Sequence, residues 1–268
     1  MTVSAKRKLV VVGNGMAGAR AVEEILARGG GEMFDIIVFG DEPYGNYNRI
    51  LLSNVLNGQQ NPAEIFINPL EWYAANSITL HAPARVARID RARRVVVAEN
   101  GLEEPYDTLI LATGSRPFVP KMEGCDQHGV FVFRTLDDCH KIAGHAAKCR
   151  RAVVVGGGLL GLEAARGLLT HGVEVHVVHL ADTLMNQQLD ASAGRMLRES
   201  VEKMGMRVHL GQSTTRILGE DGSVTGVEFA SGESLACDMV VISCGIVPNA
   251  ELGRDCGLQT ERAVVVDD

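Results

Sequence analysis

The sequence predicts an α/β protein with two nested domains, each built on a central parallel sheet and carrying a β-ribbon excursion. The first observation is an internal repeat of an apolar strand, a Gly-x-Gly-x-x-Gly turn, a helix and a second apolar strand. These segments are residues 8–12, 13–18, 19–27 and 35–39 in the first copy, and 151–155, 156–161, 162–169 and 173–178 in the second. A helix that joins neighbouring strands in this way makes them parallel, with a right-handed crossover.

The second observation is that these strands are uninterrupted apolar runs, typical of a sheet that is covered on both faces. The third is a set of additional strand and turn signals between the repeated units. Parallel strands are expected at 108–112 and 239–242, ribbon strands at 95–97 and 224–229, and tight turns at Asn100-Gly101 and Asp221-Gly222.

A domain boundary is expected at Arg116-Pro117-Phe118-Val119-Pro120, because prolines on both sides keep this stretch extended. We therefore predict a first domain over residues 1–118, to which residues 247–268 return. The second domain is predicted over residues 119–246.

Composition and charge exclude several classes of function. The chain has 46% hydrophobic and 22% charged residues and a net charge of −7, which is typical of a globular protein without affinity for nucleic acid or anionic membranes. No apolar run approaches the ~18 residues of a membrane span, and no signal peptide is recognisable, so we expect a cytoplasmic protein. Six cysteines without Cys-x-x-Cys spacing predict free thiols, and scattered histidines predict neither a metal site nor a catalytic acid or base.

Both glycine turns have the context of a pyrophosphate-binding loop, because each follows a strand and opens a helix. The first glycine permits the turn, the second lets the backbone approach phosphates, and the third lets the helix pack on the strand. Free N–H groups at the helix start then face the anion. We therefore predict two Rossmann-like dinucleotide sites, one at Gly13, Gly15, Met16, Ala17 and Gly18, the other at Gly156, Gly158, Leu159, Leu160 and Gly161.

Ribose recognition usually uses an acid after the second strand. Asp41 and Glu42 occupy this place in the first copy, although a solvated charged turn is the alternative interpretation. In the second copy His179 stands there, with Asp182 further on. A carboxylate would repel the 2′-phosphate of NADPH, whereas a histidine does not, and no arginine is near to bind that phosphate. Both coenzymes stay open, with a slight preference for NADH.

Several segments carry a resemblance to a known family. Residues 111–117 (LATGSRP) and 245–249 (GIVPN) resemble the connecting motifs of FAD-dependent pyridine nucleotide-disulfide oxidoreductases. Residues 47–53 (YNRILLS), 132–138 (VFRTLDD) and 156–165 (GGGLLGLEAA) resemble the N-terminal part of assimilatory NAD(P)H nitrite reductase large subunits. They are nearly as similar to the small NADH:rubredoxin reductases.

The resemblance implies a role for each matching position. FAD would lie on the first glycine loop, with Ala112, Thr113 and Gly114 passing close to it. Arg49 would lie near the pyrophosphate or the flavin, with a surface ion pair as the alternative. NADH or NADPH would lie on the second loop, with Glu163 and Gly245 near the nicotinamide. Glu163 could equally be an acid that the helix dipole favours.

The resemblance also implies how electrons leave. No cysteine occurs between residues 40 and 57, so the flavin would not reduce a thiol of its own chain. The expected acceptor is a tethered iron–sulfur cluster and sirohaem domain, or a small electron-carrier protein. The family continues past the equivalent of residue 268 into a Gly-Asp segment and a dimer-forming domain, so this chain is expected to be a fragment of a longer protein that can form a homodimer. We retain three hypotheses: a nitrite reductase large subunit, a stand-alone rubredoxin or ferredoxin-type reductase, and a nucleotide-binding module without turnover.

Overall fold

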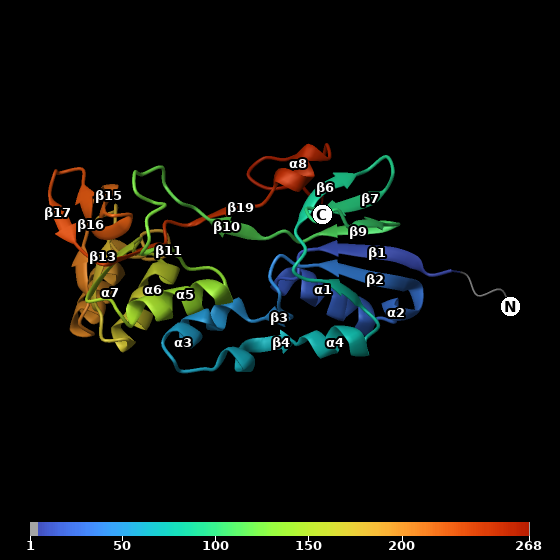
Figure 1. Ribbon diagram of the computed structural model, residues 1–268, viewed down its shortest axis with the longest axis horizontal. Coiled ribbons are helices and arrows are strands. Elements are labelled where there is room, and N and C mark those ends of the chain that lie inside the picture. Colours follow the sequence, from blue (N-terminus) through green and yellow to red (C-terminus); the bar gives the residue numbers. More distant parts are fainter. Residues whose placement is uncertain (1–4, 268) are drawn as a thin grey trace. The chain divides into compact units, whose positions relative to one another are not determined.

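The computed structural model describes residues 5–267 and divides into two compact units. Unit 1 contains the chain up to Asn48, Ile65–Arg116 and the chain from Pro248 onward, and unit 2 contains Arg49–Glu64 and Pro117–Val247. The chain passes between the units along β10 (Ser115–Pro117) and β19 (Ile246–Pro248), which pair in a two-stranded sheet (Figure 1). The predicted extended linker at residue 116 is thus a short strand.

Unit 1 is built on a parallel sheet with the strand order β5-β2-β1-β9. Its strands are β1 (Arg7–Val12), β2 (Phe34–Phe39), β5 (Thr79–His81) and β9 (Thr108–Leu111). Two antiparallel additions are β3 (Asn46–Tyr47) with β4 (Phe66–Asn68), and β6 (Val86–Asp90) with β7 (Val95–Ala98) and β8 (Glu103–Pro105). The helices are α1 (Met16–Ala27), α2 (Gly30–Met33), α4 (Leu70–Ala75) and α8 (Glu251–Asp255).

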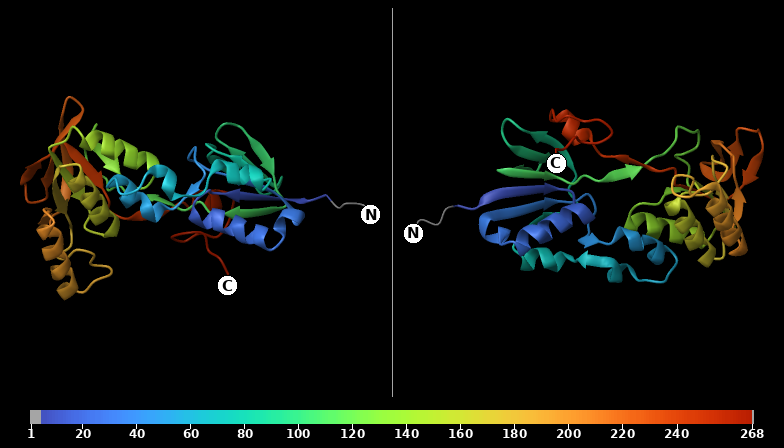
Figure 2. Two further views of the ribbon diagram at one scale, coloured as in Figure 1. Left: turned by 90° about the horizontal axis from the view of Figure 1, so that it is seen from below. Right: turned by 180° about the vertical axis from the view of Figure 1, so that it is seen from behind.

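Strand β1 contributes to a core on each face of this sheet. Leu9 and Val11 pack with Val22 of α1 and Tyr73 of α4 on one face. Val10 and Val12 pack with residues of β6 and β7 on the other. Figures 1 and 2 show α1 on one side of the parallel strands and the β6–β7 ribbon on the other. The prediction of a sheet covered on both faces is confirmed.

Unit 2 repeats this plan with a parallel sheet of order β11-β18-β12-β13-β14. Its strands are β11 (Val130–Val132), β12 (Arg151–Val155), β13 (Glu174–Val178), β14 (Arg207–His209) and β18 (Met239–Ile242). The antiparallel excursion is β15 (Thr214–Glu220), β16 (Ser223–Phe229) and β17 (Ser234–Ala236). The helical segments are α5 (Leu136–Ala146), α6 (Leu159–Thr170), α7 (Ala191–Lys203), α3 (Leu52–Leu56) and the 3-10 turns η1 (Arg49–Leu51) and η2 (Pro62–Ile65).

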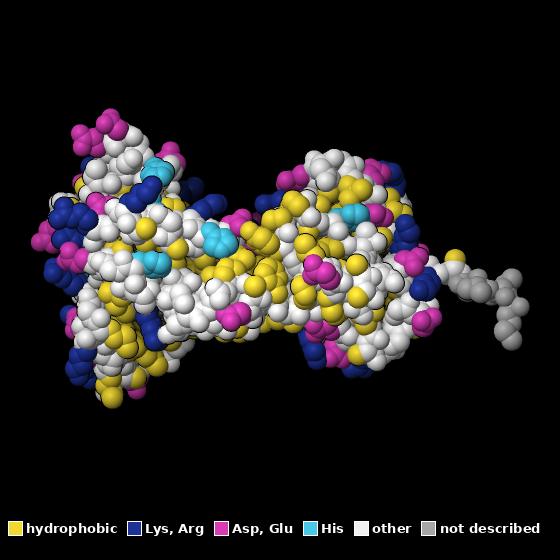
Figure 3. Space-filling view, turned by 60° about the horizontal axis from the view of Figure 1, so that its bottom comes forward, with side chains coloured by type: hydrophobic (Ala, Val, Ile, Leu, Met, Phe, Trp, Pro, Cys, Tyr) yellow, Lys and Arg dark blue, Asp and Glu magenta, His cyan; other side chains and the backbone are white. Residues whose placement is uncertain are grey.

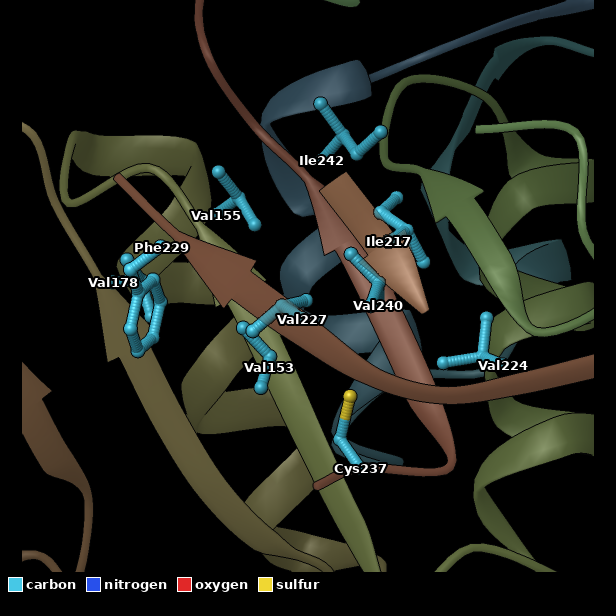
Figure 4. Close-up of a cluster of buried hydrophobic side chains, with 10 residues drawn as sticks. All are labelled: Val153, Val155, Val178, Ile217, Val224, Val227, Phe229, Cys237, Val240 and Ile242. Atoms are coloured by element: carbon cyan, nitrogen blue, oxygen red, sulfur yellow. The ribbon is translucent and has the colours of Figure 1, made fainter. Parts of the chain in front are cut away.

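The antiparallel excursion packs on the parallel sheet of unit 2 through a cluster of buried apolar side chains (Figure 4). Val153, Val178 and Val240 point from the parallel strands toward Ile217 and Val227 of the ribbon. The predicted turn between β15 and β16 has positive φ at both Asp221 and Gly222, 51° and 76°. That backbone matches the right-handed twist of the flanking strands, which favours a tight hairpin.

Both helices after the glycine turns begin three residues before their predicted starts at Ala19 and Leu162. The first helical residues are Met16 and Leu159. A glycine in the pattern suggested a turn there, but the third glycine of each motif lies inside the first helical turn. The close contact between helix and strand, described below, outweighs the low helix propensity of glycine.

Candidate dinucleotide-binding sites

The first and third glycines of each loop have a structural role that the geometry makes explicit. Gly13 and Gly156 have φ of 118° and 124°, a region that L-residues with a side chain avoid. A Cβ at Gly13 would lie 2.6 Å from the carbonyl carbon of Ala112, the residue after β9. A Cβ on either third glycine, Gly18 or Gly161, would overlap the carbonyl oxygen of the first glycine in its own loop.

The second glycine of each loop faces open space instead. A Cβ on Gly15 or Gly158 would meet no atom of the protein within 4 Å. Each residue is the N-cap of its helix, and its carbonyl accepts the first helical hydrogen bond, from Ala19 and Leu162 at 3.0 Å. The two loops are therefore shaped alike, with room for a ligand where the backbone approaches it.

The starts of these two long helices lack the side-chain caps that the long helices α5 and α7 have; the short helices α2, α3, α4 and α8 also lack them. No side chain caps α1 or α6, and neither has an acid in its first turn. In contrast, Thr135 and Asp138 form a capping box on α5, and Asp190 caps α7. Uncapped N–H groups and the positive end of the helix dipole are what an anion such as a pyrophosphate requires. The residues of both loops are therefore suited to holding a pyrophosphate.

A buried polar network holds the first loop. The side-chain carbonyl of Asn14 accepts a hydrogen bond of 2.6 Å from the Tyr73 hydroxyl, and its amide donates to Tyr44 O at 3.3 Å. The backbone carbonyl of Asn14 accepts from the buried Asn46 side chain at 3.2 Å. The residue between the first two glycines is thus tied to β3 and α4.

The corresponding position in the second loop is Gly157. Its N–H donates to His179 Nδ1 at 3.1 Å, and its carbonyl accepts from Met185 N–H at 2.9 Å. His179 Nε2 lies 3.1 Å from Asn186 Oδ1. His179 follows β13 as predicted, but both of its ring nitrogens contact the protein's own chain.

Acidic residues follow β2 as predicted. Glu42 is half-buried, and its carboxylate accepts a hydrogen bond of 2.6 Å from the Tyr47 hydroxyl. Asp41 is exposed and lines a hollow in unit 1. The other lining residues of that hollow are Pro83, Ala84, Arg85, Glu99 and Asn100.

The small-residue turn after β9 is fastened to the returning C-terminal segment. Thr113 Oγ1 donates to Asn249 O at 2.6 Å, and Asn249 Nδ2 donates back to Thr113 O at 2.8 Å. The backbone N–H of Asn249 donates to Gly114 O at 2.9 Å. Arg116 holds the same asparagine through Oδ1 and forms an ion pair of 2.8 Å with Glu251. Ala112, Thr113 and Gly114 therefore form a backbone surface beside the first loop.

Three further predicted residues lie in unit 2. Burial raises the pKa of the Glu163 carboxyl in the second turn of α6, and among residues 5–267 it has no hydrogen-bond or ion-pair partner. Arg49 donates from Nη1 to Arg134 O at 3.0 Å. Gly245, after β18, faces open space. The first residue of each of these two helices is exposed to solvent: Leu159 of α6 is 57% exposed and Met16 of α1 is 37% exposed.

The remaining titratable groups form no second reactive centre in the described part of the chain. All six cysteines are free, and burial raises the pKa of Cys139 and Cys237 to about 12, which keeps them as thiols. Residues 5–267 contain no cluster of histidine, cysteine and acidic residues that could hold a metal ion. Nor do they contain a helix long and apolar enough to cross a membrane. On the face drawn in Figure 3, acidic and basic side chains are interspersed.

The residues that brace the loops are not predictable from the sequence pattern. Tyr73 lies 59 residues from Asn14 in a short helix, and no local pattern connects the two. Asn249, in the segment 245–249, binds the turn after β9. The sequence did contain a signal at Gly157. The Gly-x-Gly-x-x-Gly motif does not require a glycine between its first two glycines, so the glycine found there has a further reason.

Together, the two glycine loops on two parallel sheets define a protein that binds two dinucleotides, the architecture of flavin-dependent pyridine nucleotide oxidoreductases. Residues 7–268 match the pyridine nucleotide-disulphide oxidoreductase family, and the chain belongs to this family. The predicted family, fold class and enzyme class are confirmed, and FAD with NADH or NADPH are the cofactors of this family.

Individual relatives agree with this assignment. The chain is 46% identical over 263 residues to a nitrite reductase [NAD(P)H] of Bacillus subtilis, covering 98% of this chain and 32% of that protein. It is 31% identical to a rubredoxin-NAD(+) reductase of Pseudomonas putida, covering 97% of this chain and 67% of that protein. The ferredoxin reductase for the CYP199A2 system of Rhodopseudomonas palustris superposes with a TM-score of 0.91 at 29% identity, covering 97% of this chain and 64% of that one. The chain thus spans about a third of the length of the nitrite reductase.

Proposed function

We propose that the chain is the NAD(P)H-oxidising, FAD-binding part of a longer protein that reduces nitrite. The single observation that supports the binding of two nucleotides is the repeated glycine loop. Each copy opens a helix without a side-chain cap and has open space at its second glycine, Gly15 or Gly158. Unit 1, the predicted FAD domain, would bind FAD on its loop, and unit 2 the nicotinamide nucleotide. The similarity to the Bacillus nitrite reductase, 46% against 31–32% for the ferredoxin and rubredoxin reductases, favours nitrite as the final acceptor.

The residues of the chain bind and orient; the cofactor supplies the redox chemistry. Bound FAD would supply two-electron chemistry toward the nicotinamide and one-electron chemistry toward the acceptor. The N–H groups at the start of α1, which include those of Met16 and Ala17, would hold the FAD pyrophosphate, and Thr113 and Gly114 would offer backbone to the flavin side. The hollow beside Asp41 is suited to the adenosine, with the Asp41 carboxylate accepting from ribose hydroxyls.

In unit 2 the N–H groups of Leu159 and Leu160 would bind the coenzyme pyrophosphate. The half-buried Glu163 carboxylate lacks a partner of its own in the described chain, so it can accept a hydrogen bond from the nicotinamide amide. Gly245 leaves space for the ring. Arg49, whose Nη1 donates to Arg134 O, would lie near the pyrophosphate or the flavin. His179 contacts the second loop by accepting the Gly157 N–H.

Electrons would then leave the chain, because no cysteine lies between residues 40 and 57 to accept them. Burial also raises the pKa of the Cys139, Cys149 and Cys237 thiols. A one-electron acceptor fits this requirement, and we propose the iron–sulfur and sirohaem region of the longer protein. Free thiols suit a reducing compartment, so we place the protein in the cytoplasm. A homodimer of the longer protein is part of the same proposal.

The first test is an absorption spectrum of the purified protein after incubation with FAD and desalting, followed by anaerobic addition of NADH or NADPH. We expect a flavin band that is bleached by the coenzyme. Gly15→Ala should lose the flavin, whereas Gly158→Ala should keep it and bleach much more slowly. A folded protein that retains flavin but is bleached by neither coenzyme would contradict the proposal and favour a binding module without turnover.

The final acceptor needs a separate experiment on the full-length protein. Nitrite-dependent oxidation of NADH or NADPH is the expected outcome. The second candidate, a stand-alone reductase, is supported by the relatives of which this chain covers 64–67%. It would replace the first if an added ferredoxin or rubredoxin is reduced rapidly while nitrite is not.

A further inference from the structure

The two glycine loops differ at the position between their first two glycines. In the first loop Asn14 fills this position with a side chain that binds Tyr73 and Tyr44. In the second loop Gly157 has no side chain. The side chains of Leu184 and His179 occupy the space where a side chain of residue 157 would lie. A Cβ there would lie 2.6 Å from Leu184 Cδ2 and 2.9 Å from His179 Cγ.

Gly157 is also held through both of its backbone polar groups. Its carbonyl accepts from Met185 N–H at 2.9 Å and its N–H donates to His179 Nδ1 at 3.1 Å. A backbone N–H can only donate, so Nδ1 must be the unprotonated nitrogen of the imidazole. The proton then lies on Nε2, which donates to Asn186 Oδ1 at 3.1 Å.

His179 is itself fixed by the backbone between two parallel strands. Its N–H donates to His209 O at the end of β14, at 2.8 Å, and its carbonyl accepts from Gln212 N–H at 3.0 Å. With the backbone fixed and both ring nitrogens bonded, the imidazole has one orientation. That orientation points the acceptor at the glycine loop and leaves no ring nitrogen for a ribose hydroxyl or a 2′-phosphate.

We infer that His179 is a positioning residue for the coenzyme loop, which it braces by accepting the Gly157 N–H, and that it does not choose between NADH and NADPH. The inference rests on the proposed binding of a nicotinamide nucleotide at this loop. Gly157 lies directly between the first glycine, which forms the turn, and Gly158, which faces the ligand. Holding this N–H restrains the Gly156–Gly157 peptide, which directly precedes Gly158 and the helix start where the pyrophosphate would lie.

This role makes a prediction that differs from that of a ribose contact. A residue that bound the 2′-hydroxyl or the 2′-phosphate would change the ratio of the two affinities when replaced. A brace on the shared pyrophosphate loop contributes equally to both coenzymes, because NADH and NADPH have the same pyrophosphate.

The test compares two substitutions of similar size. Asn places its Oδ1 as many bonds from the backbone as His Nδ1, so His179→Asn keeps the acceptor, whereas His179→Leu fills the space without one. We expect His179→Leu to raise the Kd of NADH and of NADPH alike, about fivefold to tenfold for one lost hydrogen bond, in equilibrium fluorescence titrations. His179→Asn should stay within about twofold of the wild type, and so should His140→Leu at an exposed histidine of α5. The turnover number at saturating coenzyme should change little, with the effect in KM.

A second measurement needs no coenzyme. Amide hydrogen exchange at Gly157 should be faster in His179→Leu and near the wild-type rate in His179→Asn. Unchanged exchange in His179→Leu, a shifted NADH-to-NADPH ratio, or an Asn variant as weak as Leu would each overturn the inference. If the wild type binds neither coenzyme while Gly157 exchange responds as expected, the proposed function fails and the brace itself stands.

Discussion

The Tyr73 hydroxyl donates a 2.6 Å hydrogen bond to Asn14 Oδ1, across 59 residues of sequence. Tyr73 is buried on the α1 face of the unit 1 sheet, and this burial raises the pKa of its phenol. The hydroxyl therefore stays protonated as a donor under ordinary conditions. Through this bond a short helix that carries no glycine motif helps to hold the first glycine loop, together with Asn46 of β3.

Replacing Tyr73 by Phe should weaken FAD binding and stability together. The substitution removes the donor and leaves Asn14 Oδ1 without it, at a cost of about 1–2 kcal/mol in the free energy of unfolding. We expect a several-fold rise in the Kd of FAD, measured by flavin fluorescence titration, with the Kd of NADH unchanged. Tyr106→Phe is the matched control, because Tyr106 is half-buried in the same unit and its hydroxyl has no described partner. An FAD affinity equal to that of the control would contradict the assigned role.

Replacing two glycines of the second loop by Ala should affect different properties: stability at Gly161 and coenzyme binding at Gly158. A Cβ at Gly161 would overlap Gly156 O, so Gly161→Ala should separate α6 from β12 and destabilise the protein by roughly 1–3 kcal/mol or more. A Cβ at Gly158 meets nothing, so Gly158→Ala should leave the melting temperature unchanged while it impairs coenzyme binding. Thermal unfolding without ligand distinguishes the two, and equal melting temperatures would count against the packing argument.

Within unit 2, the segment Arg49–Glu64 packs on α6 through Leu56 and Gly167. A Cβ at Gly167 would lie 2.7 Å from Leu56 Cγ, and Leu56 O lies 2.8 Å from His171 Nε2. Gly167→Ala should therefore cost about 1–3 kcal/mol through overpacking, and Leu56→Ala about 2–5 kcal/mol through a cavity. Because both changes act on one contact, the double variant should be less destabilised than the sum. Strict additivity in urea unfolding would show that the contact is not formed.

Unit 2 should lose stability as the pH falls through the ordinary histidine range. His176 and His209 stack and share a hydrogen bond of 2.9 Å, and burial lowers the pKa of both from 6.5. The groups that face them are Glu174, which bonds His176, and the cations Arg151, Arg198 and Arg207. The unfolded chain binds more protons than the folded one just below this value, so the free energy of unfolding rises with pH there.

The corresponding measurement is urea unfolding between about pH 7.5 and pH 5. The wild type should lose stability toward the acid end, and His176→Gln/His209→Gln should show a smaller slope whatever its stability at neutral pH. His140→Gln should keep the wild-type slope, because His140 is exposed on α5. A double variant with an unchanged slope would assign the pH dependence to other groups.

The sequence by itself determined the repeated framework and the backbone chemistry of the two loops. Strand, glycine turn and helix are local in sequence, and their roles follow from local conformation: φ above 100° at Gly13 and Gly156, and helix starts without caps at Gly15 and Gly158. Periodicity and glycine spacing report such features directly. Only the helix starts were predicted late, because close packing overrides the low helix propensity of glycine.

The tertiary structure alone decided what holds those loops. Tyr73 reaches Asn14 from a different segment, Asn249 returns to bind Thr113, and the segment around Leu56 packs on α6. The same holds for His179, whose place after β13 suggested a ribose contact, while its ring bonds Gly157 and Asn186. Such contacts depend on distances between residues far apart in the chain, and no periodic pattern encodes them. They arise only when the packed sheets bring both partners within hydrogen-bonding reach.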